Sequence, residues 1–179
     1  MALLPIIETP DPLLRRISAP VEDVNEEVRK LIRDMFDTMY AAPGIGLAAI
    51  QIGVPIRLLV IDLQESAEEG GEPMRQPRVF INPEILEASE TLQVYSEGCL
   101  SVPDQYAEVE RPDHIRARWL DENGVQHEQE LDGLIGICLQ HEMDHLEGIL
   151  FIDHLSRLKR DMVLKKLAKA RKEQNKKAA

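Results

Sequence analysis

The pentapeptide His141-Glu142-Met143-Asp144-His145 constrains the fold more than any other feature of this 179-residue chain. In a helix, residues i and i+4 share a face, so both imidazoles can reach one metal ion. Glu142 projects beside them, where it can take a proton from a water molecule. The preceding turns are apolar, which predicts a buried helix: Leu134, Ile135, Ile137, Cys138 and Leu139. A metal pair at the end of a buried helix is therefore favoured over two histidines on a surface.

A catalytic metal site of this kind needs a third protein ligand and one open position. The extended pattern HExxHxxGxxH would require Gly148, which is present, and a histidine at position 151, where the chain has Phe151. His154 lies one turn further on and would need a different loop geometry. Glu147 is too close to the pair to serve. The downstream candidates for a third ligand are weak.

An upstream candidate lies in the segment Glu97-Gly98-Cys99-Leu100-Ser101, which leads to Pro103. A thiolate at Cys99 would complete a Cys/His/His ligand set. The alternative is a small buried apolar residue, which is the commoner role of a free cysteine. Cys138, three residues before His141, is open to the same two interpretations, and there a place in the core is favoured.

A third segment, Gly44-Ile45-Gly46-Leu47-Ala48-Ala49-Ile50-Gln51, combines small residues with a side-chain amide. Its two glycines lack the preceding strand and the third glycine of a phosphate-binding loop. The small residues instead allow another backbone to approach closely, and Gln51 brings an amide donor to that approach. An ordinary loop between a helix and a strand is the alternative interpretation.

The composition fits one globular domain over residues 1–179, because 44% of the residues are hydrophobic. The most apolar window, residues 50–63, is broken by Gly53, Pro55 and Arg57, so no membrane span is predicted. The first residues, MALLPIIETPDP, lack the regions of a secretory signal. Two cysteines cannot form the disulfide framework of a secreted scaffold, so we expect a reducing, cytoplasmic location.

Charge is unevenly distributed along the chain. The formal net charge is −11, but residues 157–179 carry ten Lys and Arg against only Asp161 and Glu173, a local charge of +8. The remaining 156 residues therefore have a net charge of −19. This asymmetry predicts an acidic body and a basic C-terminal helix and tail, about residues 156–179, with its own partner. A solvated helix that is merely basic is the alternative.

The periodicity of apolar residues predicts an α+β fold. We expect small mixed or antiparallel sheets packed around a central helix that carries HExxH, with a further helix at the C-terminus. Helices are predicted over residues 26–41 with Asn25 as cap, over 133–147 with Asp132 as cap and Gly148 at the end, and onward from Ser156. Strands are predicted over 56–63, 78–82, 91–95, 106–111, 115–119 and 125–131, and an exposed loop over 64–77.

Three blocks together make the chain resemble the bacterial peptide deformylases over nearly its whole length: residues 44–51, residues 97–101, and Gln140-His141-Glu142-Met143-Asp144-His145-Leu146-Glu147-Gly148. The resemblance implies a metal-dependent hydrolase that removes the formyl group from the N-terminal formylmethionine of nascent polypeptides and releases formate. It implies that the metal ligands are Cys99, His141 and His145. It also implies that Glu142 acts as general base, while the Gln51 side chain and the Leu100 backbone N–H stabilise the oxyanion.

The resemblance further implies how the substrate is held. The methionine side chain would enter an apolar pocket lined by Ile45, Leu134, Ile137 and Cys138. The segment Gly44, Ile45 and Gly46 would pair with the substrate backbone as an added strand, so residues beyond methionine would be recognised only loosely. An ion pair between Glu97 and Arg111 would support the site from beneath.

One divalent metal ion per chain is expected. The resemblance points to Fe²⁺ in the cell, and the ligand set could also take Zn²⁺, Ni²⁺ or Co²⁺ in a preparation. The expected partners are N-formylmethionyl nascent peptides and, through the basic C-terminal helix, the ribosome. We expect a monomer that does not associate with membranes.

Two other functions explain part of the sequence. An HExxH zinc metalloprotease would need His154 as a ligand and would cleave unformylated peptides. A non-catalytic, peptide-binding relative would be expected to lose Glu142 or Gln51, and both residues are present. Neither alternative explains Cys99 in its setting.

Overall fold

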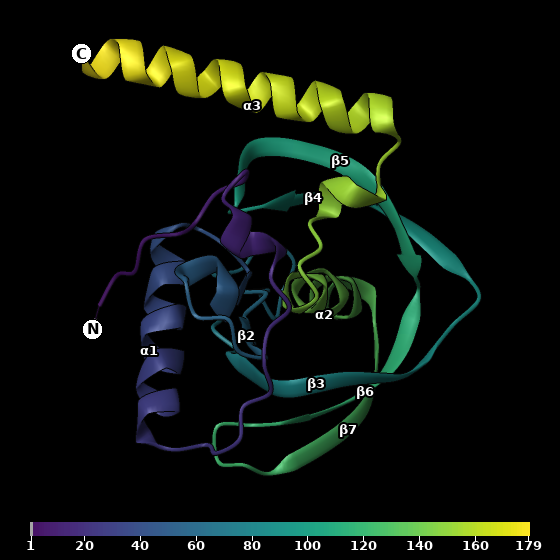
Figure 1. Ribbon diagram of the computed structural model, residues 1–179. Helices are drawn as coiled ribbons and strands as arrows, with labels where there is room; N and C mark the ends of the chain where they lie inside the picture. Colours follow the sequence, from purple (N-terminus) through teal and green to yellow (C-terminus); the bar gives the residue numbers. More distant parts are fainter. Residues whose placement is uncertain (1) are drawn as a thin grey trace.

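The computed structural model describes residues 2–179, which form an α+β fold, as the sequence predicts (Figure 1). Helices and strands occur in a mixed order along the chain. In that order the elements are η1 (Pro12–Arg15), α1 (Glu26–Ala41), β1 (Gly46–Ala48), η2 (Ala49–Ile52), β2 (Leu58–Ile61), β3 (Arg78–Ala88), β4 (Leu92–Cys99), β5 (Val102–Pro112), β6 (His114–Leu120), β7 (Gln126–Asp132), α2 (Gly133–Leu146), η3 (Phe151–His154) and α3 (Arg157–Ala178), where η marks a short 3-10 helix.

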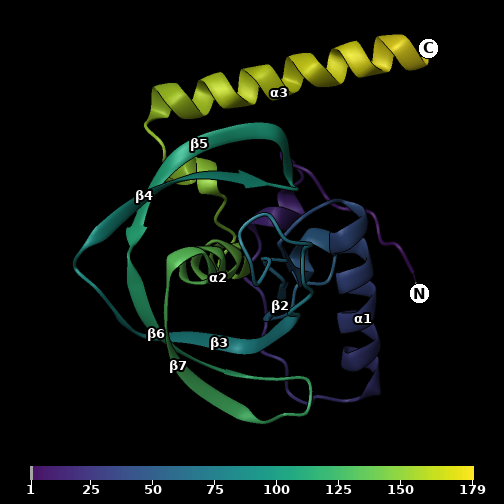
Figure 2. The same ribbon diagram turned by 180° about the vertical axis from the view of Figure 1, so that it is seen from behind.

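The strands form two antiparallel sheets. The larger sheet has the order β1-β2-β3-β6-β7, and the smaller one is the β4-β5 hairpin. The pairing of β3 with β6 shifts register twice, between Ile81 and Glu84 and again between Ile85 and Glu87. Such irregularities bend and twist a strand. In Figures 1 and 2, α2 accordingly lies between the curved larger sheet and the β4-β5 hairpin.

Helix α2 is apolar because protein surrounds it. It contacts β1, β2 and β7, and also β5 and β6. Leu139 and Leu146 are fully buried, and each such side chain contributes about 1.5–3 kcal/mol by leaving water. The cluster that surrounds them comprises Ala48, Ile50, Leu59, Ile61, Phe80, Ile115, Ala117, Trp119, Leu131 and Cys138.

Helix α1 has the bounds that its sequence predicts. The Asn25 side chain accepts a hydrogen bond of 3.0 Å from the Val28 backbone N–H, so the predicted cap is confirmed. Met35 and Met39, on the predicted apolar stripe, are fully buried. They pack in a second cluster that includes residues of β1, β2 and β3. The helix is thereby fixed against the face of the sheet opposite α2.

Several predicted strands and one predicted cap differ from the structure. The strands β3, β4 and β5 extend beyond their predicted ranges, and β1 lies in what was predicted to be a loop. A three-residue strand is too short to show a periodic pattern, and its partner β2 is remote in sequence. Asp132 directly precedes α2, but its side chain makes no capping hydrogen bond. The chain enters α2 through Gly133 with a φ of +57°, which replaces the expected cap geometry.

The predicted exposed loop over residues 64–77 is tied down at its two ends by one buried carboxylate. Asp62 accepts hydrogen bonds of 3.0 Å from the backbone N–H groups of Gln64 and Gln76. Its other oxygen accepts the Tyr40 hydroxyl at 2.5 Å. The Asp62 backbone N–H donates to the Ile45 carbonyl at 2.8 Å, so the loop and the segment before β1 are held together.

The basic C-terminal residues form the long helix α3, which crosses the outside of the β4-β5 hairpin (Figure 1). The Ser156 side chain accepts the Lys159 backbone N–H at 3.3 Å, which confirms the predicted cap. Val163 and Leu167 are buried against β5 and η3, and most of the helix is exposed. Within residues 2–179, no helix has the length and hydropathy needed to cross a membrane.

Gly148 ends α2, as predicted, and its substitution gives a test of the fold. Its φ is +72°, and a Cβ there would lie 2.4 Å from the Arg15 carbonyl oxygen. Gly124 has nearly the same φ, +74°, but open space around it. We expect Gly124→Ala to lower the free energy of unfolding by about 1 kcal/mol through backbone strain alone. Gly148→Ala should cost about 3 kcal/mol because backbone atoms must also move. Denaturant unfolding measures both, and equal losses would contradict the close packing.

Candidate metal centre and cleft

Two histidines on α2 and one cysteine at the end of β4 bring three metal-ligating atoms together. The ligand atoms of Cys99, His141 and His145 all lie within 4.8 Å of one another, and Cys99 Sγ is 3.3 Å from His145 Nε2. The imidazole centroids are 5.2 Å apart, because i and i+4 residues share a helix face. His154 is not part of this group, and its Nε2 instead lies 2.8 Å from an Asp144 oxygen.

These three donors fit a divalent cation. Thiolate and imidazole groups at this spacing match a tetrahedral site with three protein ligands and one open position. Burial holds the pKa of His145 well below its usual value, which keeps the imidazole neutral and its lone pair available. Close by, the Glu142 Oε2 atom is buried without a hydrogen-bond partner among the described residues. A buried, unpartnered oxygen in the same cleft as these donors fits a site for a cation and its water.

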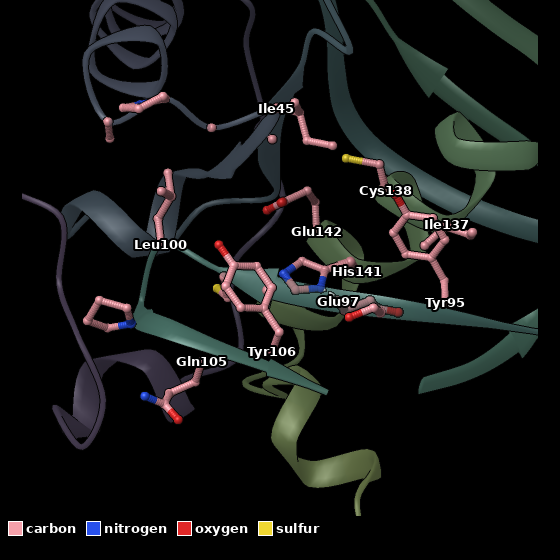
Figure 3. Close-up of a pocket in the computed structure, with 18 of the residues that line it drawn as sticks. Ile45, Tyr95, Glu97, Leu100, Gln105, Tyr106, Ile137, Cys138, His141 and Glu142 are labelled. Carbon is pink, nitrogen blue, oxygen red and sulfur yellow. Dashed lines mark hydrogen bonds and ion pairs between the residues drawn. The ribbon is translucent and has the colours of Figure 1, made fainter. Parts of the chain in front are cut away.

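A buried ion pair fixes the orientation of His141. Glu97 Oε1 lies 2.7 Å from His141 Nδ1 (Figure 3). Arg111 donates to both Glu97 oxygens, at 2.6 and 2.9 Å. The expected Glu97–Arg111 pair is therefore confirmed. Burial alone would raise the pKa of Glu97, but the hydrogen bonds from His141 and Arg111 outweigh it and lower the pKa to about 2. The permanent carboxylate accepts the Nδ1 proton, which leaves Nε2 of His141 free to bind a metal.

The ion pair continues to the surface through Asp144, for which the sequence indicated no specific partner. Arg111 also donates to an Asp144 oxygen at 2.9 Å. The same oxygen contacts His154. This pairing explains what His154 does in the fold, and it removes the residue that the zinc-protease alternative requires as a ligand.

Glu142 lies inside the site because β1 has a glycine where it passes the helix. A Cβ on Gly46 would lie 2.5 Å from Glu142 Oε1 and 3.0 Å from Cys138 Sγ. Any larger residue would therefore displace the carboxylate. Burial raises the pKa of Glu142 to about 7. A carboxylate whose pKa lies near neutrality can both accept and return a proton.

Gln51 is oriented by hydrogen bonds at both ends of its side-chain amide. Its oxygen accepts the Ala48 backbone N–H at 2.9 Å, and its Nε2 donates to Ser101 Oγ at 3.0 Å. The same nitrogen is 3.5 Å from Cys99 Sγ, so a donor stands beside the group of three candidate metal ligands. Ser101 is fully buried and was not singled out in the sequence, although it lies in the block that contains Cys99. Only the fold indicates that it holds an amide fifty positions earlier in the chain.

A cleft of about 550 Å³ opens over this group (Figure 3). It contains Gln51, Cys99, Leu100, His141 and Glu142 in its walls, whereas His145 lies behind them. All of the residues expected to bind substrate also line it: Gly44, Ile45, Gly46, Leu134, Ile137 and Cys138. The lining residues that the sequence did not indicate include Tyr95, Asp104, Gln105 and Tyr106. From the sequence, Tyr95 and Tyr106 could be predicted only as residues of two strands, without any indication that both line one cleft.

The fold and the site define a class of protein. A Cys/His/His group, a buried glutamate of raised pKa and an oriented amide share one cleft, which is the arrangement of a mononuclear metal-dependent hydrolase.

Comparison with known proteins is specific. Residues 3–161 match the polypeptide deformylase family, and the chain belongs to it. The chain is 70% identical to a peptide deformylase of Rhizorhabdus wittichii, over 96% of this chain and 97% of that protein. A crystal structure of a peptide deformylase from Legionella pneumophila superposes with a TM-score of 0.87 at 45% identity, covering 97% of this chain and 98% of the other. A crystal structure of the peptide deformylase from Ehrlichia chaffeensis in complex with actinonin superposes with a TM-score of 0.87 at 42% identity, covering 95% of this chain and 98% of the other. The resemblance stated from the sequence is confirmed.

The two cysteines give a matched test of the metal site. We expect Cys99→Ala to lose bound metal, because two imidazoles alone hold a divalent cation weakly. Cys138→Ala should retain about one ion per chain, since its sulfur is outside the group of three donors. The measurement is metal content by elemental analysis of proteins prepared without oxygen. If Cys138→Ala lost the metal and Cys99→Ala kept it, Cys99 would not be the third ligand.

Proposed function

We propose that this chain hydrolyses the N-formyl group of formylmethionyl nascent polypeptides, with formate and a free amino terminus as products. The observation that carries the proposal is the placement of Glu142 and Gln51 in the same cleft as Cys99 and His141 of the Cys/His/His group, in a member of the deformylase family. We propose Cys99, His141 and His145 as the metal ligands. When bound there, a divalent cation would act as a Lewis acid that polarises the formyl carbonyl and lowers the pKa of water.

Glu142 is proposed as the general base and then the general acid. It takes a proton from water as the water oxygen bonds to the formyl carbon. It then gives this proton to the amine nitrogen as the carbon–nitrogen bond breaks. Burial and a pKa of about 7 suit a group that must do both at neutral pH.

Gln51 and Leu100 are proposed to stabilise the charge that develops on the formyl oxygen. The Gln51 amide is already oriented by Ala48 and Ser101, so little reorganisation is needed during the reaction. Leu100 directly follows Cys99 and lines the same cleft, so its backbone N–H is proposed as the second donor. A donor aimed at a developing oxyanion typically contributes about 2.7–4 kcal/mol of transition-state stabilisation.

The methionine side chain is proposed to enter the apolar end of the cleft. Leu134, Ile137 and Cys138 lie on the α2 wall, and Ile45 faces them from the segment before β1. Strand β1 is an edge of the larger sheet, which suits addition of the substrate backbone along Gly44–Gly46. Asp62 supports this segment through the Ile45 carbonyl. Pairing through backbone atoms explains how many different nascent chains can be accepted.

The ion in the cell is proposed to be Fe²⁺, with Zn²⁺, Ni²⁺ or Co²⁺ taken up in some preparations. Two imidazoles and one thiolate suit all four. Zinc has the higher affinity by the general order of divalent metals, so the proposal of iron rests on the family resemblance and on supply in the cell. We further propose that the chain works in the cytoplasm as a monomeric single domain.

Substitution of Glu142 tests the chemistry. We expect Glu142→Gln to lower kcat/KM for formate release from a short formyl-Met peptide by about 10²–10⁴-fold while metal stays bound, because proton transfer is lost. Glu147→Gln, just past the end of the same helix and paired with Arg57, is the matched control and should change the rate little.

The same peptide with an acetyl group in place of the formyl group is the substrate control, and it should release no formate. Unchanged formate release by Glu142→Gln would exclude this residue as the base. No formate from the metal-loaded parent protein would overturn the deformylase proposal itself.

The ribosome is proposed as a partner through α3. The helix is held by Val163 and Leu167, while its lysines project into solvent. Ten Lys and Arg in residues 157–179 provide the positive charge that contacts with ribosomal RNA phosphates require. Nascent chains appear at the ribosome, so docking there would bring the enzyme to its substrate.

Charge reversal tests docking without disturbing the packed face of α3. Lys165, Lys169 and Lys172 are exposed, and the triple change to Glu should abolish co-sedimentation with ribosomes at low salt. Formate release from a short peptide should be unaffected, because these residues are outside the cleft. Co-sedimentation equal to that of the parent protein would contradict the proposed docking.

A further inference from the structure

The mouth of the cleft carries exposed apolar side chains that the proposed chemistry does not use. Tyr106 is 72% exposed, Tyr95 is 42% exposed and Ile45 is 38% exposed, and all three line the same cleft. Single exposed apolar residues are ordinary on protein surfaces. Three around one opening are typical of a surface that contacts a ligand. Ile45 already belongs to the proposed methionine pocket, which leaves the two tyrosines unexplained.

Tyr106 is held in place by a glycine on the neighbouring strand. Gly98 of β4 pairs with Tyr106 of β5. A Cβ on Gly98 would lie 2.4 Å from Tyr106 Cε1, so the ring lies directly over the glycine backbone. Within residues 2–179, no other aromatic ring and no cation stacks on it. The backbone supports one side of the ring, and the other side is open.

The Tyr106 ring is placed to contact the residues of the substrate that follow its formylmethionine. Gly98 directly precedes Cys99, so the ring is adjacent to the proposed metal ligands but on the outer side of the cleft (Figure 3). A peptide with its formyl group at Cys99 and its methionine side chain against α2 must leave through this mouth. Its second and third residues then pass Tyr106, the ring that lies next to Cys99.

The charge of the residues that line the cleft indicates which substrate side chains its mouth suits. Among the described residues that line the cleft there is no Lys or Arg, and the acids are Glu97, Asp104 and Glu142. Asp104 is the exposed one of the three. An acidic side chain therefore finds no positive partner there, whereas an aromatic one finds an open ring of matching shape.

We propose that Tyr106 is a specificity-determining residue that packs against the side chain of the second or third residue of the substrate and favours an aromatic side chain there. This inference rests on the proposed deformylase function. Tyr is well suited to the role, because it offers a large contact area with few rotatable bonds. The preference adds to backbone pairing, which by itself would not distinguish these residues.

The test compares kcat/KM for formate release from formyl-Met-Ala-Ser, formyl-Met-Phe-Ser and formyl-Met-Ala-Phe. We expect the parent protein to favour at least one phenylalanine peptide over formyl-Met-Ala-Ser by about 2- to 10-fold, the range for an aromatic contact. Tyr106→Ala should bring that ratio to about one, whereas Tyr106→Phe should keep it, because the ring and not the hydroxyl makes the contact. Val94→Ala, an exposed change on the same hairpin but outside the cleft, is the control and should keep it as well.

Two results would overturn the inference while leaving the proposed function intact. One is equal rates on all three peptides by the parent protein. The other is an aromatic preference that persists in Tyr106→Ala. No formate from any peptide by the metal-loaded parent would overturn the proposed function, and this inference with it.

Discussion

The carboxylate of Glu97 is the interaction on which the geometry of the site depends. It projects from β4 and joins the β4-β5 hairpin to α2 by accepting a hydrogen bond from His141, while Arg111 of β5 holds the same carboxylate within the hairpin. A buried ion pair of this kind adds little net stability, because desolvation of the two charges offsets their attraction. Loss of one partner is nevertheless costly, about 3–5 kcal/mol, since the other charge is left buried. The pair therefore acts mainly to fix position: Cys99, two residues beyond Glu97 on β4, is held opposite the two histidines of α2.

Close approach of backbones is the second requirement, and it is met by small residues. Gly46 allows β1 to pass Glu142, and Gly98 allows the Tyr106 ring to lie on β4. Gly148 allows the end of α2 to pass the Arg15 carbonyl. At each place a side chain would occupy space that a functional or structural group now fills. Gly46 and Gly98, which line the cleft, thus set how closely its walls pack.

Much of this arrangement could be predicted from residues alone, and the remainder depends on long-range contacts. Helices α1 and α3 follow from apolar periodicity and caps, which are local signals. The shared helix face of His141 and His145 on α2 follows from their i, i+4 spacing. Spacing alone, however, leaves two interpretations of Cys99, a metal ligand or a small buried residue, because its distance from the histidines is set by the packing of the β4-β5 hairpin against α2. Strand β1, the hydrogen bond from Gln51 to Ser101 and the ring of Tyr106 over Gly98 all join positions with no local pattern in common.

The distribution of polarity around the cleft separates catalysis from recognition. The inner wall is polar and carries two sets of contacts, one from Gln51 through Cys99 to His145 and one from His141 through Glu97 to Arg111, so its groups have little freedom to move. The outer wall is apolar and partly exposed, with side chains that can adjust to what they meet. A rigid inner wall suits a reaction at one fixed group, the formyl carbon, which every substrate shares. An adaptable outer wall suits chains that differ after their first residue. One cleft can hence combine strict chemistry with broad acceptance, and the proposed contact with Tyr106 would bias that acceptance without contributing to the chemistry.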